Sequence, residues 1–346
     1  MNSLSATLKN TTPPPKNNTF FGISILRVIA MFGVFLVHFG QRFNLQGVLR
    51  SITDFGRYGV ELFFVISGFL MLQSLDKCTT WKDVLRFYIK KAIRLLVLYY
   101  LVILWYFISE TFIYKDIVVD PYRLGWLRYI FLLNGIVPAD TYLWSNVGIT
   151  WTIPLFAMAY LVTPLLYKGL KINSTIKLGV LFLISFIACY FSNKYFNGWV
   201  SFLNYYYMFV GGMLVYKAVL EEKTQIVNIG ILMLVFSLLI IPFSSLLQIT
   251  LLFMILLCVS YNFNINNKYF NKFISIIDTY SYTIYLGHGV IFCSIIDKIY
   301  LPPVLRLIIA IVGTITLCLV LYHIYEKPLT QLLNKKLIQK NANKDA

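Results

Sequence analysis

The chain has 346 residues, of which 59% are hydrophobic and only 13% are charged, and its mean hydropathy is +0.73. This composition excludes a soluble globular domain, because ordinary soluble domains carry about 25% charged residues. The formal net charge of +16 does not indicate a nucleic-acid partner, since the cations follow the pattern of a membrane protein.

The predicted fold is an all-α, polytopic integral membrane protein with about ten transmembrane helices, each needing about 20 mostly apolar residues. The predicted spans begin near Ile23, Tyr58, Ala92, Val147, Thr175, Trp199, Gln225, Leu246, Tyr282 and Val304. With both termini in the cytoplasm, about 20 Lys and Arg residues fall in inner segments and about 9 in outer ones, as the positive-inside rule expects. We expect a mobile cytoplasmic tail over 1–21, a transmembrane domain over 22–330 and a basic cytoplasmic tail over 331–346.

The first predicted span carries two ionisable residues in a segment built for hydrocarbon. In LRVIAMFGVFLVHFG, Arg27 and His38 are eleven residues apart. That spacing is three helical turns plus about 20°, so both side chains lie on one stripe, roughly 16 Å apart along the axis. Arg27 either snorkels to the interface or binds an anion. His38 either bonds a neighbouring helix or acts as a general base that takes a proton from a hydroxyl.

The second predicted span contains an acidic residue near its outer end. In GRYGVELFFVISGFLM, Glu61 stands about one turn inside the span, close to the predicted depth of His38. A short loop over 41–57 is expected to join the two spans, so Glu61 could orient the imidazole as the acid of a catalytic triad does. The alternative is an ion pair with Arg57, four residues earlier on the same face.

Two further features of the sequence are a cluster of basic residues and five cysteines. The densest inner cluster of cations, which includes Lys91 and Arg94, precedes the third predicted span. Such clusters ordinarily set topology and meet anionic lipid. The five cysteines form no CxxC pair, so neither a metal site nor a disulfide framework is predicted.

These motifs, in this order, resemble the membrane-bound acyltransferase-3 family of bacterial enzymes, which typically acetylate hydroxyls of surface polysaccharides. The family's pattern of Arg, ten residues and His corresponds to Arg27 and His38, and Glu61 stands at the acidic position of its next span. Its basic pair appears as Lys91 and Arg94 in KKAIRLLVLYY. The segments ITWTIPLFAMAYLVTPLL, YSYTIYLGHGVIF and YEKPL resemble its later motifs, so the resemblance covers about residues 22–330.

The resemblance implies an O-acyltransferase, most simply an O-acetyltransferase, in the bacterial cytoplasmic (inner) membrane. Its donor would be cytoplasmic acyl-CoA, with acetyl-CoA the first choice, held by Lys91, Arg94 and Arg27. The implied partners are a carbohydrate or lipid-linked sugar acceptor and membrane lipid, with no nucleic acid and no metal. Two positions depart from the family: Lys91 keeps the charge of an arginine but lacks its planar fork, and Val97 replaces a proline.

The resemblance also assigns expected roles within the membrane. His38, Arg27 and Glu61 are the expected catalytic residues, and His38 would either deprotonate the acceptor hydroxyl or carry the acyl group itself. The ninth predicted span places Tyr285 and His288 one turn apart. We expect both to bind substrate, with Trp151 as a further cavity-lining residue. An interhelical hydrogen bond is the alternative for His288.

A membrane transporter is the competing function. Ten spans with buried Arg, His and Glu would also suit an exporter of polysaccharide or a proton-coupled transporter. No internal repeat is evident in the sequence. A basic pair aligned with Arg27 and His38 on the cytoplasmic side favours an acyl-CoA enzyme, because a flippase does not need it.

Overall fold

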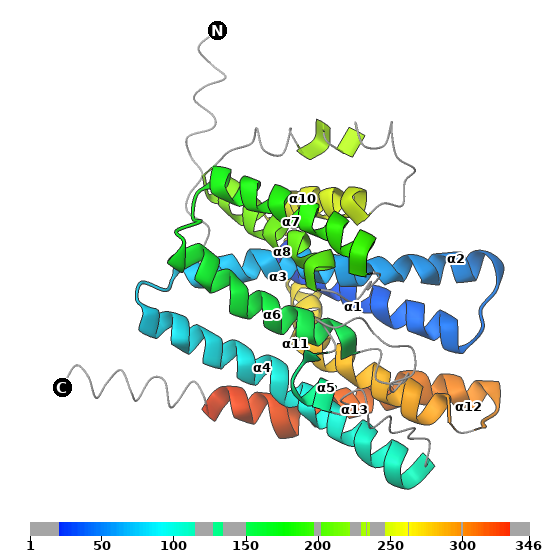
Figure 1. The fold of residues 1–346 in the computed structure, drawn as a ribbon. Helices are drawn as coiled ribbons and strands as arrows, with labels where there is room; N and C mark the ends of the chain where they lie inside the picture. Colours follow the sequence, from blue (N-terminus) through cyan, green and yellow to red (C-terminus); the bar gives the residue numbers. More distant parts are fainter. Residues whose placement is uncertain are drawn as a thin grey trace.

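The computed structural model describes residues 21–114, 127–133, 150–196, 202–221, 230–232, 234–235, 246–261, 263–298 and 300–332. Every regular element in these residues is a helix (Figure 1), which confirms the all-α class for the described chain. Most of the predicted span that begins near Gln225 and nearly all of both predicted tails lie outside the described residues.

The main helices follow one another along the chain. The first six are α1 (Phe21–Arg42), α2 (Gly47–Phe55), α3 (Gly59–Asp76), α4 (Trp81–Ile108), α5 (Leu127–Ile130) and α6 (Thr152–Pro164). The others are α7 (Thr175–Phe196), α8 (Phe202–Leu220), α10 (Leu246–Tyr261), α11 (Lys268–Ile291), α12 (Pro303–Ile308) and α13 (Thr314–Leu321). Short 3-10 or π-helical turns extend or join them at Gly56–Tyr58, Ser109–Tyr114, Leu165–Gly169, Phe292–Ile296, Ile309–Gly313 and Tyr322–Glu326.

Five described helical stretches are long and apolar enough to cross a membrane. They are Phe21–Arg42, Gly47–Asp76, Trp81–Ile113, Thr175–Tyr195 and Pro303–Leu332. This supports a multi-pass membrane protein, while the number of about ten spans and the orientation of the termini stay predictions.

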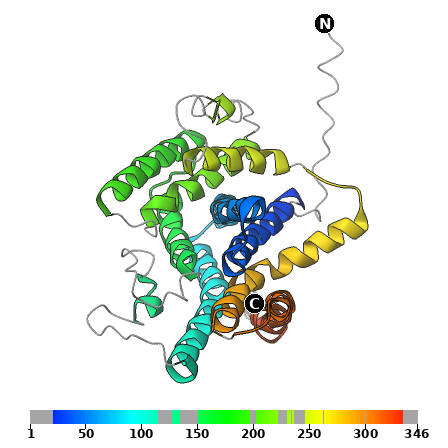
Figure 2. The same ribbon diagram turned by 90° about the vertical axis from the view of Figure 1, so that its right-hand side faces the viewer.

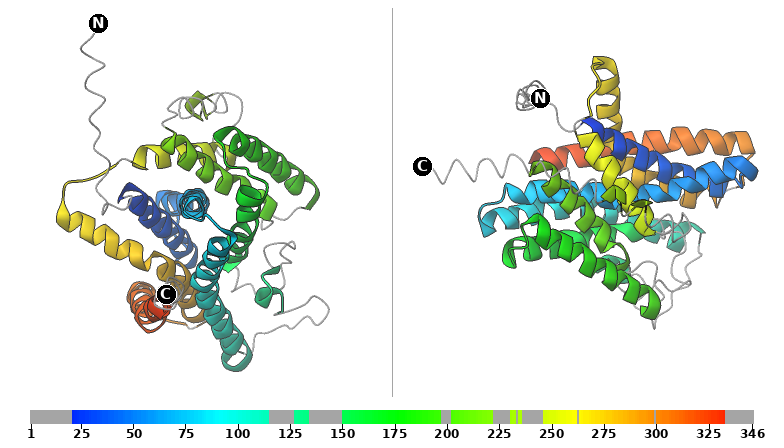
Figure 3. Two further views of the ribbon diagram at one scale, coloured as in Figure 1. Left: turned by 90° about the vertical axis from the view of Figure 1, so that its left-hand side faces the viewer. Right: turned by 90° about the horizontal axis from the view of Figure 1, so that it is seen from above.

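The α3 helix forms the centre of the bundle, and the other helices surround it (Figures 2 and 3). The most apolar window of Gly47–Asp76 is 67% buried, whereas that of Pro303–Leu332 is only 17% buried. Two glycines allow α3 and α8 to approach closely: Gly68 lies against the backbone of Phe209, and Gly212 against that of Val65. Small residues at such contacts bring helix backbones together in membranes.

The connection between the first two spans differs from the sequence prediction. The loop predicted over 41–57 is wrong: α1 ends at Arg42, and after a turn over 43–46 the chain is helical again from Gly47. The α2 helix, the turn Gly56–Tyr58 and α3 then form one helical stretch. Helix forms here because VLRSITDF contains no glycine or proline breaker, and its apolar residues recur on one exposed face: Val48, Leu49, Ile52 and Phe55.

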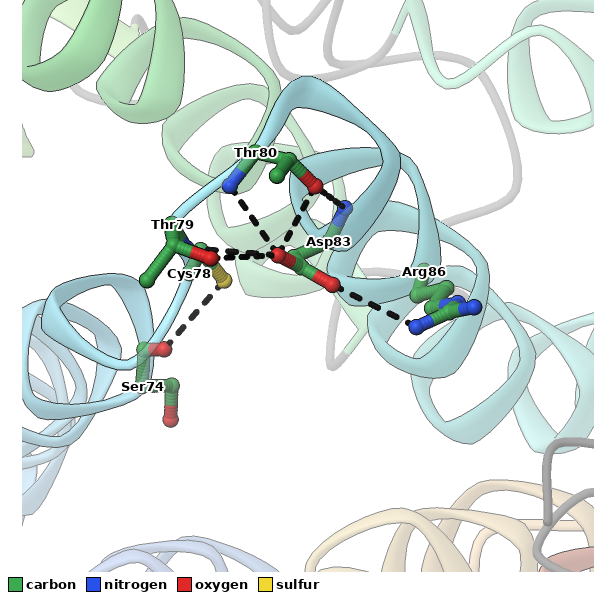
Figure 4. A network of polar contacts seen from close by, with 6 residues as sticks. All are labelled: Ser74, Cys78, Thr79, Thr80, Asp83 and Arg86. Atoms are coloured by element: carbon green, nitrogen blue, oxygen red, sulfur yellow. Dashed lines mark hydrogen bonds and ion pairs between the residues drawn. The ribbon is translucent and has the colours of Figure 1, made fainter. Parts of the chain in front are cut away.

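A capping box fixes the start of α4 (Figure 4). The Thr80 hydroxyl accepts a hydrogen bond from the Asp83 backbone at 3.3 Å, and the Asp83 carboxylate accepts one from the Thr80 backbone at 3.0 Å. Arg86 donates to the same carboxylate at 3.3 Å. This reciprocal arrangement satisfies N–H groups that a helix terminus leaves free, and it sets the rotation of α4 that carries Lys91 and Arg94.

Candidate active site

The α1 helix packs beside α11 (Figure 2), and its polar stripe contacts α11 at two positions. Arg27 forms an ion pair with Asp278, and farther along both helices the imidazole of His38 lies 5.4 Å from that of His288, centroid to centroid. These two contacts occur in the same order along both helices, so α1 and α11 run parallel. We call this line of paired polar residues the α1–α11 seam.

A cavity of about 170 Å³ opens beside one end of the seam. Its walls come from α1, α3, α4, α6 and α11, and most of its lining is apolar. Its charged and phenolic lining residues are Arg27, Lys91, Arg94, Tyr160, Tyr282 and Tyr285. The structure therefore brings into one cavity the three cations that were expected from the sequence to hold the donor.

The cations of the cavity are unequally balanced by carboxylates. The Arg94 Nε lies 3.8 Å from Glu326 Oε1, a long ion pair, and the Arg94 side chain is 62% exposed. Lys91 has no carboxylate partner in the described chain, and its Nζ lies 4.9 Å from the centroid of the Tyr160 ring. A cation over an aromatic face is only partly compensated, so Lys91 supplies the cavity with positive charge that is open to an anion.

Asp278 is a site residue that was not predicted from the sequence, as are Tyr160, Tyr282 and Gln41. The Asp278 side chain is only 9% exposed, one carboxylate oxygen contacts Arg27, and the other is buried without a hydrogen-bond partner in the described residues. A signal was present: Asp278 precedes His288 by ten residues, which echoes the eleven-residue spacing of Arg27 and His38. Two helices with ionisable residues at matching spacing can pair them at two depths.

Each imidazole of the seam has one ring nitrogen with no hydrogen-bond partner among the described residues. The Nδ1 of His38 lies 3.1 Å from Gln41 Oε1, and the Nδ1 of His288 lies 3.0 Å from the Ile284 carbonyl oxygen. Both oxygens only accept, so each Nδ1 carries the proton and each Nε2 is left as an acceptor. The Nε2 of His288 is buried and has no partner in the described residues. A substrate hydroxyl is a group that such nitrogens can bind.

Glu61 does not lie beside His38. The backbones of Gly33 and Gly56 touch, so in this antiparallel pair Glu61 falls near the level of Arg27. That is about 15 Å along the helix axis from His38. The expectation failed because the second helical stretch begins at Gly47 instead of Tyr58, which moves Glu61 from the end of the span to its interior.

The alternative partner for Glu61 is not formed either. Arg57 donates a hydrogen bond to the Tyr58 hydroxyl at 2.9 Å. Glu61 is 8% exposed, and its Oε2 is buried without a hydrogen-bond partner in the described chain. The residue that contacts the His38 ring through a hydrogen bond is Gln41, a neutral group that can orient the imidazole but cannot offset its charge.

Of the three expected substrate-binding residues, two are neighbours in the structure and the third is not beside them in the cavity wall. Tyr285 lines the cavity, and its hydroxyl lies 2.6 Å from the Thr152 hydroxyl. His288 lies next to it, with ring centroids 6.1 Å apart. Trp151 is not among the described residues that line this cavity, and its ring packs 5.2 Å from that of Tyr205, centroid to centroid, so its role in substrate binding stays a prediction. The α6 helix contributes Ile153, Phe156 and Tyr160 to the cavity wall.

Within the described residues, no group of three or more His, Cys, Asp or Glu side chains is arranged to hold a metal ion. The described side chains of the site provide a cationic cavity, three phenols and two imidazoles.

Comparison with known proteins agrees with a group-transfer site. A sequence model described as an acyltransferase domain matches residues 20–323, which is most of the chain. A protein of Acidianus two-tailed virus named "Putative acetyltransferase ORF330" is 33% identical over 164 residues, 47% of this chain and 45% of that protein. The match thus spans less than half of that relative's length. No solved structure matches the chain. From the extent of the domain match, the chain belongs to the acyltransferase-3 family.

Proposed function

We propose that the protein is an O-acetyltransferase of the bacterial inner membrane, with its N-terminus in the cytoplasm. Acetyl-CoA is the donor, and a hydroxyl of a cell-surface polysaccharide or of its lipid-linked precursor is the acceptor. The observation that carries the proposal is the α1–α11 seam, which connects a cationic cavity to a pair of imidazoles with free nitrogens. Family membership supports the acyl-transfer chemistry.

The cavity provides what the phosphates and the arm of a CoA thioester need. Lys91 offers charge with no carboxylate partner in the described residues, and Arg94 is exposed enough to turn from Glu326 towards a phosphate. Arg27 is held against Asp278, which keeps its guanidinium at the cavity wall. Guanidinium groups bind phosphate through paired, charge-assisted hydrogen bonds. The apolar lining suits the pantetheine arm, which then extends along the seam.

The imidazoles carry out the transfer. His38 Nε2 removes the proton from the acceptor hydroxyl while the oxygen attacks the thioester carbonyl. The new C–O bond forms, the C–S bond breaks, and the departing thiolate of CoA takes the proton back from the imidazolium. His288 Nε2 accepts a hydrogen bond from the bound sugar and orients it. Gln41 keeps the proton of His38 on Nδ1, so that Nε2 stays available.

Mass spectrometry of surface polysaccharide tests this function. Cells with the protein should yield polysaccharide with the mass increment of an acetyl group, and cells with His38→Ala should not, because the base is lost. The matched control is His323→Ala: His323 is exposed and its Nε2 lies 3.1 Å from the Tyr280 hydroxyl, away from the seam. Unmodified sugar from wild-type cells, with a changed amount of exported polymer, would favour an exporter instead.

A further inference from the structure

Three cations surround one carboxylate at the end of the seam away from the cavity. The Nε of Arg42, the last residue of α1, lies 2.9 Å from Asp297 Oδ2, and Arg306 and Lys298 act on the same carboxylate. Burial raises the pKa of Asp297 against the opposing effect of the three cations. We call these four residues the far-end cluster. The cluster thus brings three cations to one carboxylate.

The guanidinium groups of the far-end cluster are not fully used. The Nε–H of Arg306 is buried and donates to no acceptor in the described chain, whereas the Nε of Arg42 is already paired with Asp297. The Nη2 of Arg42 donates a hydrogen bond to the Cys293 sulfur at 3.5 Å, and sulfur is a weak acceptor. The Nη2 of Arg306 donates to the Arg42 carbonyl oxygen at 3.0 Å. Leaving buried charged donors without acceptors costs free energy, so an oxyanion bound here would complete the cluster.

Membrane topology does not account for these cations. The cluster lies about 22 Å along α1 from Arg27, at the end of the bundle where α12 also lies (Figure 1). If the cavity faces cytoplasmic acyl-CoA, as the proposed function requires, the cluster faces the opposite side. Lys and Arg are depleted in short loops on that side, and the anionic leaflet that attracts them is the cytoplasmic one.

We propose that Arg42, Lys298 and Arg306 bind an oxyanion, a phosphate or a carboxylate, that the acceptor carries. The enzyme therefore acylates anionic glycans in preference to neutral ones. Arg42 follows His38 by about one turn, or about 6 Å along the helix. An anion held at the cluster leaves hydroxyls of the same or the adjacent sugar within reach of the imidazoles. The acceptor role rests on the proposed function, whereas the anion site does not.

Binding of three small probes to the purified full-length protein tests the site without turnover. Isothermal titration calorimetry in a neutral detergent, with coenzyme A saturating the cavity, compares glucose 6-phosphate, glucuronate and glucose. The wild type should bind at least one anionic probe about tenfold more tightly than glucose, as one charge-assisted hydrogen bond predicts. Arg306→Gln should remove that preference and leave glucose binding unchanged.

Two further variants separate charge from folding. Lys298→Gln should weaken anion binding while the hydrogen bond from Arg306 to the end of α1 stays intact. This variant therefore tests the anion site even if Arg306→Gln does not fold. Arg50→Gln is the matched control, because Arg50 follows the same turn of the chain and is already paired with Asp54 at 2.8 Å. It should bind all three probes as the wild type does.

The outcomes are distinguishable. Equal binding of charged and neutral probes by the wild type overturns the anion site, and so does an anion preference that persists in Arg306→Gln and Lys298→Gln. Preference for only one of the anionic probes identifies the source of the oxyanion. Acyl transfer from acetyl-CoA is followed in the same samples: an intact anion preference without any transfer would reject the proposed enzyme and keep the site.

Discussion

At the scale of single residues, the pairing of Arg27 with Asp278 explains how an arginine can lie in the first span. A charge within a bilayer is costly unless it reaches water or a partner. Snorkelling was one explanation for Arg27, but its guanidinium contacts a carboxylate on α11 whose side chain is 9% exposed. The pair neutralises both groups and holds the guanidinium at the cavity wall.

Replacing the carboxylate of this pair should be strongly destabilising. In Asp278→Asn the Arg27 charge remains without compensation, and breaking a buried pair in this way costs about 3–5 kcal/mol. Thermal unfolding in detergent should show a large fall in Tm, which Arg27→Gln in the same chain should partly restore.

The matched control is Asp54→Asn, which breaks the exposed pair with Arg50. Exposed pairs are worth about 0–1 kcal/mol, so its Tm should stay close to that of the wild type. If Asp278→Asn were equally silent, Arg27 would not depend on Asp278.

At the scale of helices, close glycine contacts decide which residues share a depth. The contact of Gly33 with Gly56 sets the register of α1 against the second helical stretch, and it places Glu61 near Arg27. The contacts of Gly68 and Gly212 do the same for α3 and α8. A side chain added at these positions would overlap backbone atoms of the opposing helix, which cannot move aside as a flexible side chain can.

Gly212→Ala should therefore lower the free energy of unfolding. Forcing α3 and α8 apart costs about 1–3 kcal/mol, more than alanine gains from its better helix propensity. Gly179→Ala on α7 is the control, since nothing lies within 4 Å of the added methyl group. That variant should be as stable as the wild type or more stable. A Tm for Gly212→Ala at or above that of Gly179→Ala would refute the close contact.

At the scale of the whole molecule, cationic groups gather at two places along the bundle. The turn over 43–46 and α12 lie at one end, and the turn over 77–80 lies at the other (Figure 1). The cationic cavity and the far-end cluster are joined by the α1–α11 seam. In the proposed function, the donor enters at the cavity, the acceptor binds at the far-end cluster, and the two meet at the imidazoles, which requires that the cavity face the cytoplasm.

Labelling of single cysteines in cells measures this orientation. Gln46→Cys and Lys77→Cys place thiols at two exposed positions in the opposite turns. A membrane-impermeant maleimide should label position 46 in intact cells and position 77 only after permeabilisation. The unsubstituted chain, whose five cysteines are buried or half-buried, gives the background. The reverse labelling pattern would place the cavity outside and exclude cytoplasmic acyl-CoA as its ligand.

Properties set within one segment of the chain could be predicted from the sequence more fully than properties set by contacts between segments. The all-helical class follows from apolar composition and was predicted for the described chain. The shared stripe of Arg27 and His38 follows from helix geometry alone, and the structure confirms that both face α11. The prediction of a loop over 41–57 was wrong because part of this segment forms α2, whose apolar face is exposed. The hydropathy of the segment did not distinguish a helix from a connecting loop.

The sequence by itself determined that this chain is helical, apolar and a member of a family of acyltransferases, and it identified the cations and imidazoles that line the site. Only the tertiary structure decided the partners across helices: Asp278 for Arg27, His288 for the His38 ring, and no carboxylate for Lys91 among the described residues. Composition and helical spacing act within one segment. Partners across helices depend on register, which close glycine contacts and the length of one turn set between segments far apart in the chain.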